Sequence, residues 1–198
     1  MNTTACVLFL CAVSIGGCAS PPPEAVPAER ASILPAGSSS DFWQPAPIGD
    51  PPAAREQPQI ANVSIADLDQ DGLLDVLVCD AGRRRLSWIR QSPKDVYTEQ
   101  VLAEVRAPGH VEATDVDGDG DLDLLVADLG ELFPSNQRIG SVIVLENAGG
   151  GRFVRHVAVE GLPRVADVRA GDLDGDGDQD LAVANGNSNN LTILNNRD

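Results

Sequence analysis

The stretch "DVDGDGDLDLLVAD" at residues 115–128 places six aspartates among fourteen residues and ends in an apolar run. Similar strings occur at residues 67–78, "DLDQDGLLDVLV", and at residues 172–183, "DLDGDGDQDLAV". All three share the pattern D-x-D-x-D-G-x-x-D, and their starts lie 48 and 57 residues apart (67 to 115 and 115 to 172). Three copies with the same aspartates and the same glycine indicate a repeat architecture.

The residues around each acidic string alternate between polar and apolar types, as half-buried β-strands do. In the first repeat this pattern predicts four short strands, "NVSIAD", "LDVLVCDAG", "RRLSWIRQ" and "YTEQVLAEV". The second repeat also supplies four, whereas the third supplies "DVRAGD", "QDLAVANG" and "NLTILNN" and lacks a fourth. No segment of ten or more residues keeps an apolar period of 3.6, so we expect an all-β chain built from four-stranded units.

These repeats resemble the blades of the FG-GAP/VCBS family, which also form the β-propellers of integrin α-subunits. The resemblance rests on the three acidic strings with their flanking strands, and it covers about residues 60–198. It implies a partial β-propeller of about three four-stranded blades at 60–106, 107–160 and 164–198, the last of them incomplete. It also implies that the acidic loop joins the first two strands of each blade and holds one Ca²⁺.

The spacing within each loop favours calcium on chemical grounds as well. Alternate aspartates can point to one centre if the backbone curls, and the glycine at the sixth position permits the sharp turn. Ca²⁺ accepts six to eight oxygen ligands at loose angles, whereas Mg²⁺ requires a tight octahedron and zinc prefers His or Cys. We therefore predict about three ions. The ligands expected are Asp67, Asp69, Asp71, the carbonyl of Leu73 and Asp75; Asp115, Asp117, Asp119, the carbonyl of Asp121 and Asp123; and Asp172, Asp174, Asp176, the carbonyl of Asp178 and Asp180.

Three other interpretations of the loops fit less well. An EF-hand needs Glu at position 12, which here is Val78, Val126 or Val183. Thrombospondin-type calcium arrays depend on disulfides, and the chain has only four cysteines, three of them in its first 18 residues. Plain solvated Asp-Gly turns would leave four converging carboxylates to repel one another.

Acidity is concentrated in these loops. The formal charge is −16, and the loops hold fourteen of the thirty acidic residues, four in the first and five in each of the others. A nucleic acid requires a basic face, so we expect no nucleic-acid partner. The only basic cluster, "RRR" at 83–85, is interpreted as a solvated strand edge.

The N-terminus resembles a bacterial lipoprotein signal. Residues 1–17 contain the apolar run "CVLFLCAVSIGG", which is followed by Cys18 as the expected lipidation site, although no Lys or Arg precedes the run. Ordinary secretory cleavage and an uncleaved segment are the alternatives. Residues 19–59 hold ten of the fourteen prolines and are predicted to be a disordered linker. We expect an extracytoplasmic protein of the bacterial envelope, held by a lipid anchor (in the outer membrane of a Gram-negative host), or a secreted one.

No catalytic constellation is recognisable in the sequence, so we expect a non-enzymatic module for surface interaction or scaffolding. His110 and His156 are interpreted as strand residues, and Cys79 as a small buried hydrophobe. The expected partner is an unknown protein or glycan. The alternatives are the N-terminal part of a calcium-dependent propeller enzyme, such as a polysaccharide lyase, and a pure spacer. Because fewer than three full blades are present, we expect a fragment of a longer propeller that self-associates through open blade edges. The alternatives are that the chain oligomerises to close the propeller, or that residues 19–59 lend a strand.

Overall fold

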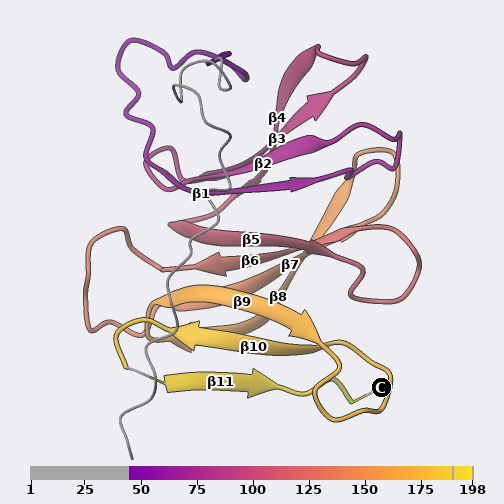
Figure 1. Cartoon of the computed structure of the whole chain (residues 1–198). Coiled ribbons are helices and arrows are strands. Elements are labelled where there is room, and N and C mark those ends of the chain that lie inside the picture. Colours follow the sequence, from indigo (N-terminus) through magenta and orange to yellow (C-terminus); the bar gives the residue numbers. More distant parts are fainter. Residues whose placement is uncertain (1–44, 189, 198) are drawn as a thin grey trace, which may run out of the picture. The chain divides into compact units, whose positions relative to one another are not determined.

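The structure, a computed structural model, describes residues 45–188 and 190–197, which form β-strands and no helix. None of the described residues therefore builds a helix long and apolar enough to cross a membrane. The strands make three antiparallel sheets that follow one another along the chain (Figure 1). They are β1 (Ile60–Ala66), β2 (Asp75–Asp80), β3 (Arg85–Gln91), β4 (Tyr97–Glu104), β5 (Pro108–Thr114), β6 (Asp123–Asp128), β7 (Gly140–Asn147), β8 (Phe153–Leu162), β9 (Val165–Gly171), β10 (Asp180–Asn185) and β11 (Asn190–Leu194).

Each sheet is a simple meander in which consecutive strands are neighbours. The orders are β1-β2-β3-β4, β5-β6-β7-β8 and β9-β10-β11. The sequence-based prediction of an all-β partial propeller, with two four-stranded blades and a third that lacks its fourth strand, is confirmed for the described residues. The first strands of successive sheets lie against each other, β1 against β5 and β5 against β9.

Consecutive sheets pack together through two apolar cores, one between each pair of sheets. Between the first and second sheets, Leu77, Cys79 and Trp88 pack against residues of β5, β6 and β7. Between the second and third, Leu125 and Val183 belong to the other core. All six residues of β6 are buried, because the second sheet is covered on both faces. A strand with two buried faces need not alternate, which explains the four consecutive apolar residues "LLVA" between Asp123 and Asp128.

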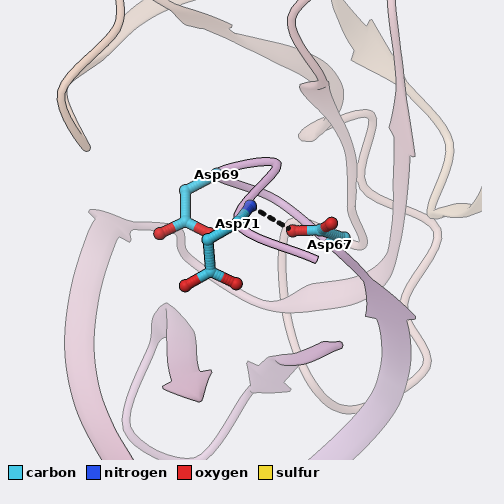
Figure 2. Close-up of side chains that lie close together, drawn as sticks. All are labelled: Asp67, Asp69 and Asp71. Atoms are coloured by element: carbon cyan, nitrogen blue, oxygen red, sulfur yellow. Dashed lines mark hydrogen bonds between the residues drawn. The ribbon is translucent and has the colours of Figure 1, made fainter. Parts of the chain in front are cut away.

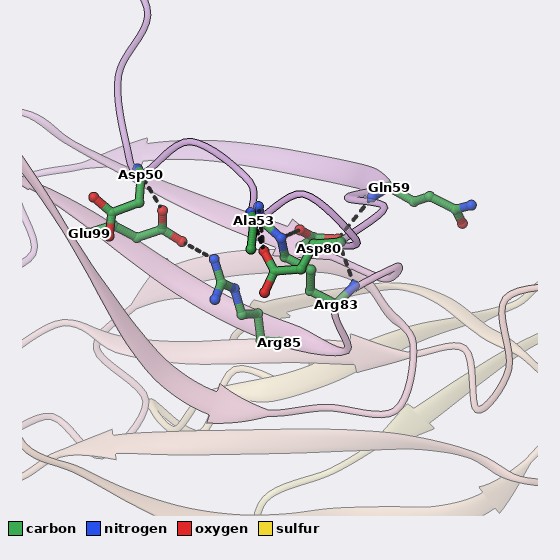
Figure 3. A network of polar contacts seen from close by, with 8 residues as sticks. Asp50, Ala53, Gln59, Asp80, Arg83, Arg85 and Glu99 are labelled. Atoms are coloured by element: carbon green, nitrogen blue, oxygen red, sulfur yellow. Dashed lines mark hydrogen bonds and ion pairs between the residues drawn. The ribbon is translucent and has the colours of Figure 1, made fainter.

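The stretch from residue 46 to residue 59, inside the predicted linker, lies against the outer face of the first sheet (Figure 3). The Asp50 amide donates to Glu99 Oε2 at 3.0 Å, and the Gln59 amide donates to Asp80 Oδ1 at 2.9 Å. At Gly82 a Cβ would lie 2.2 Å from the Gln57 carbonyl oxygen, so this close approach requires glycine. The part of the linker prediction that covers residues 19–44, like the signal at 1–17 and Cys18, lies outside the described residues.

The expectation that the basic run at 83–85 is a solvated strand edge was wrong for Arg83 and Arg85, whereas Arg84 is exposed. Arg83 bridges Glu56 at 3.0 Å and Asp80 at 3.6 Å, and Arg85 bonds Glu99 at 2.7 Å (Figure 3). The side chains of Arg83 and Arg85 are only 11% and 22% exposed. Arg83 joins the N-terminal stretch to the first sheet through Glu56, and Arg85 binds Glu99, which accepts a hydrogen bond from the Asp50 amide of that stretch.

Candidate metal centres

All three acidic loops connect the first two strands of a sheet, as predicted. They follow β1, β5 and β9, and they emerge at the same side of the structure, on the right in Figure 1. The first two loops touch, since the Gln70 side-chain amide donates to the Gly120 carbonyl oxygen at 2.7 Å. The repeat thus places one charged loop of every sheet on the same side of the row of sheets.

In each loop, three aspartates offer one carboxylate oxygen each, and these oxygens lie within 4.8 Å of one another. The groups are Asp67, Asp69 and Asp71; Asp115, Asp117 and Asp123; and Asp172, Asp174 and Asp180. Figure 2 shows the first group, with Asp69 and Asp71 next to each other and the Asp71 amide donating to Asp67. The structure therefore brings nine of the predicted ligand residues together in threes.

The aspartate at the first position of each loop organises the turn. Asp115 accepts hydrogen bonds from the amides of Gly118 at 2.8 Å and Gly120 at 3.0 Å. Asp172 does the same with Gly175 and Gly177. Gly118 and Gly120 have φ of 76° and 95°, a region that residues with a Cβ rarely adopt. The glycines let the backbone curl around the carboxylate.

The aspartate at the ninth position is a buried clamp. Asp123 is 1% exposed, and its two oxygens accept from the amides of Val116 at 2.9 Å and Asn147 at 2.8 Å. Asp75 and Asp180, both 0% exposed, bind the equivalent amides. One carboxylate thus ties the loop to the end of the third strand of its sheet. Sequence reasoning treated this residue only as a metal ligand and missed its structural contacts.

The crowding of carboxylates in the loops affects the pKa values of two aspartates, Asp117 and Asp174. The hydrogen bond from the Asp119 amide lowers the pKa of Asp117, but desolvation and the charges of Asp123, Asp119 and Asp115 outweigh it, so the pKa is raised. The pKa of Asp174 is also raised, by desolvation and then by the charges of Asp176 and Asp180. A raised carboxyl pKa means that the ionised form lacks sufficient compensation from the protein itself.

The remaining predicted ligands lie elsewhere in the loops. Asp75 lies outside the first group, and Asp119 and Asp176 lie outside the second and third. The side chains of Asp119 and Asp176 instead accept from the amides of Asp121 and Asp178. The inward-facing carbonyls of Leu73, Asp121 and Asp178 stay a prediction.

The residues present fit a calcium ion. Each group offers only oxygen donors, as Ca²⁺ prefers, with no His or Cys among the three described clusters. In the first group, the Oδ1 atom of Asp69 is buried and accepts no hydrogen bond from any described residue. Such an oxygen requires a partner, because burial without one costs free energy.

Meander sheets in series, each with an acidic loop after its first strand, define a repeat protein of the β-propeller class. Comparison with protein families matches the FG-GAP-like repeat at residues 67–126 and 115–183. The chain belongs to the FG-GAP-like repeat family. No curated protein matches it.

Proposed function

We propose that the chain is a non-enzymatic, calcium-binding propeller module that acts outside the cytoplasm in surface interaction or scaffolding. The observation that carries the proposal is the recurrence of an oxygen-only cluster of three aspartates in the same loop of every sheet. One ion in each loop would raise the formal charge from −16 to −10 (−16 + 3 × 2). The ion would supply the positive charge that the crowded carboxylates lack.

A calcium ion bound in these loops would also affect the stability of the fold. In the second sheet, Asp115 and Asp117 belong to the loop and Asp123 begins β6, so a shared ion would join the loop to the strand. Asp123 already binds the end of β7 through the Asn147 amide. Calcium is therefore expected to stabilise the hairpin and, through it, the packing between sheets, because it binds the folded loops and hardly the unfolded chain.

Thermal unfolding of the full chain in EDTA, in millimolar Mg²⁺ and in millimolar Ca²⁺ tests the proposal. The melting temperature should rise with Ca²⁺ and much less with Mg²⁺, while native mass spectrometry counts the bound ions. Identical unfolding curves in EDTA and Ca²⁺, with no bound ion, would reject a calcium module.

A matched pair of variants locates the second site. Asp117→Asn removes one charge from the group of three, whereas Asp121→Asn removes one charge from the same loop but keeps the carbonyl predicted to bind. Calcium affinity should fall by about tenfold or more for Asp117→Asn, the scale of a 1.4 kcal/mol loss, and clearly less for Asp121→Asn. Equal effects would mean that only the total charge matters.

The proposed location rests on the lipoprotein-like signal that ends at Cys18. Cys18→Ser should abolish incorporation of labelled palmitate and move the protein from the membrane fraction to the soluble fraction. Cys79→Ser is the control, because Cys79 is a buried core residue. A wild-type protein found only in the soluble fraction would contradict the anchor.

An interaction role is supported by apolar side chains on the outermost sheets. Ile65 on β1 is 66% exposed, and Leu191 on β11 is 71% exposed. Each lies two positions from a second exposed apolar residue on the same face of its own strand, Val63 on β1 and Ile193 on β11, and contiguous exposed apolar side chains are typical of surfaces that bind a partner. A second copy of the chain fits such a surface, and light scattering of the purified protein should show association that Leu191→Lys weakens. A glycan array on the intact protein tests the expected glycan ligand.

A further inference from the structure

A positively charged side chain from β3 contacts the aspartates of the first acidic loop. Arg90, near the end of β3, contacts Asp69 Oδ2 through Nη2, and the same nitrogen lies 3.5 Å from Asp71 Oδ2. These two aspartates are members of the group of three in this loop. The guanidinium also lies over the Trp88 ring, 5.8 Å from its centroid, which holds it in place.

The other two loops have no arginine at the equivalent position. Equivalent positions in the three sheets can be identified from the aspartate at the ninth position of each loop. Asp75, Asp123 and Asp180 accept hydrogen bonds in the same way from the amides of Gln91, Asn147 and Asn196, respectively. One residue before each of these amides stand Arg90, Glu146 and Asn195. At this equivalent position the first sheet therefore has a positive residue, the second a negative residue and the third a neutral residue.

The side-chain contacts of Arg90, Asn195 and Glu146 differ in the same way as the charges of these residues. Asn195 Nδ2 donates to Asp174 Oδ2 at 3.4 Å, and Asp174 occupies the place in its loop that Asp69 has in the first. The same contact is therefore neutral in the third sheet and ionic in the first. Glu146 contacts His156 on β8 at 2.7 Å, and it supplies a negative charge at the position where the first sheet has Arg90.

The formal charges of the three sites consequently form a series. The first has four aspartates and Arg90, a sum of −3; the third has five aspartates and a neutral Asn195, a sum of −5; and the second has five aspartates and Glu146, a sum of −6. The affinity of such loops for Ca²⁺ depends strongly on the charge of the ligand set.

The first loop also differs in its backbone. Gln70 stands where the other loops have Gly118 and Gly175, and it adopts the left-handed region at φ 56°. Its side chain donates to the Gly120 carbonyl oxygen at 2.7 Å. A non-glycine residue in this region is held by its surroundings, and in the first loop these include the Arg90 contact to Asp69 and the Gln70 hydrogen bond to the second loop.

We infer that Arg90 takes the place of a metal ion in the first loop, so that Ca²⁺ binds the second and third loops first. Calcium enters the first loop only after it displaces the guanidinium from Asp69 and Asp71. The inference rests on the proposed function, because it ranks the proposed calcium sites. Asp69 and Arg90 line an open cleft of about 420 Å³ together with Trp88, so an ion can reach them from solvent.

Calcium titration of the full chain against a competing chelator, with ions counted by native mass spectrometry, tests this ranking. The wild-type protein should bind two ions tightly and a third weakly. Arg90→Gln should tighten the third by about tenfold or more, because removal of a nearby positive charge is worth at least 1.4 kcal/mol at short range. Arg85→Gln is the control, since it removes the same charge from the same strand at a residue that bonds Glu99.

The reverse substitution is Asn195→Arg, which should weaken the third site and leave one tight ion. Circular dichroism establishes that each variant is folded in EDTA and in Ca²⁺. Three equally tight ions in the wild type, unchanged by Arg90→Gln, would overturn the inference and leave the proposed function intact. A wild-type protein that binds no ion would overturn both.

Discussion

Asp123 and Asn147 are 24 residues apart in sequence, yet Asp123 Oδ1 accepts a 2.8 Å hydrogen bond from the Asn147 amide. The other oxygen of Asp123 accepts from Val116 in the acidic loop. The carboxylate therefore holds the loop, the start of β6 and the end of β7 together. Its place at the ninth position of the repeat makes one aspartate both a candidate ligand and a structural clamp.

Replacement of Asp123 by Ala should be strongly destabilising. Two partly buried amides would lose their acceptor, and each unsatisfied group costs about 1–3 kcal/mol, so we expect a loss of about 2–6 kcal/mol. Urea unfolding in EDTA measures this without a contribution from calcium. Asp121→Ala, in the same loop but partly exposed, should change the free energy of unfolding much less. If both variants were equally stable, the clamp would contribute little.

Cys79 should be unreactive in the folded protein. Its side chain is 0% exposed, and burial raises the pKa of its thiol to about 12, so almost no thiolate forms at neutral pH. Iodoacetamide labelling followed by peptide mapping should show no modification of Cys79 in Ca²⁺ and steady modification in urea. If calcium stabilises the first core, labelling in EDTA should be faster than in Ca²⁺. Rapid labelling of Cys79 in the presence of Ca²⁺ would disagree with the packing of β2.

Stability should fall with acidification because of His110 on β5. Burial lowers the pKa of His110 below its ordinary 6.5; Asp167 raises it, Arg169 lowers it and Glu112 raises it, with a net decrease. The 3.2 Å approach of Nε2 to Asp167 lacks hydrogen-bond geometry. As the pH falls, the unfolded state therefore binds the proton at a higher pH than the folded state does. The stability that neutral His110 contributes is fully present above pH 6.5, and it is lost as the pH falls through 6.5 towards the lower pKa of the folded state.

His110→Asn tests this pH dependence, since the first sheet has Asn62 at the equivalent position, where it accepts from the Val111 amide. The difference between the free energies of unfolding at pH 7.5 and pH 5.5 should shrink in this variant, measured in saturating Ca²⁺. His156→Asn is the control, because His156 is exposed on β8. A change in pH dependence caused by His156→Asn alone would point to a different group.

Hydrogen exchange should rank the sheets by the number of faces that are covered. All of β6 is buried between two cores, whereas Leu191 and Ile193 on β11 are 71% and 48% exposed. Amides of β6 and β7 should exchange most slowly, and those of β11 should exchange first, because local opening exposes little apolar surface there. Uniform protection across β6 and β11 would contradict this ranking.

The sequence by itself determined the repeat, the all-β class, the four-stranded units and the position of the acidic loops. These features are local, since alternation, Gly and Asp spacing and strand length act over a few residues. The sequence also supplied the chemistry of the candidate ligands, because the residue types alone select oxygen donors.

Only the tertiary structure decided which aspartates meet, and which side chains from elsewhere approach them. Asp75 lies outside the first group, and Arg90 reaches the first loop from β3. Arg83 and Arg85, expected at a solvated edge, form ion pairs with Glu56 of the N-terminal stretch and with Glu99 of β4. Such contacts depend on the register between β2 and β3 and on the stacking of sheets, which join residues far apart in the chain. No local pattern marks Arg90, because the equivalent residues Glu146 and Asn195 share neither its charge nor its length.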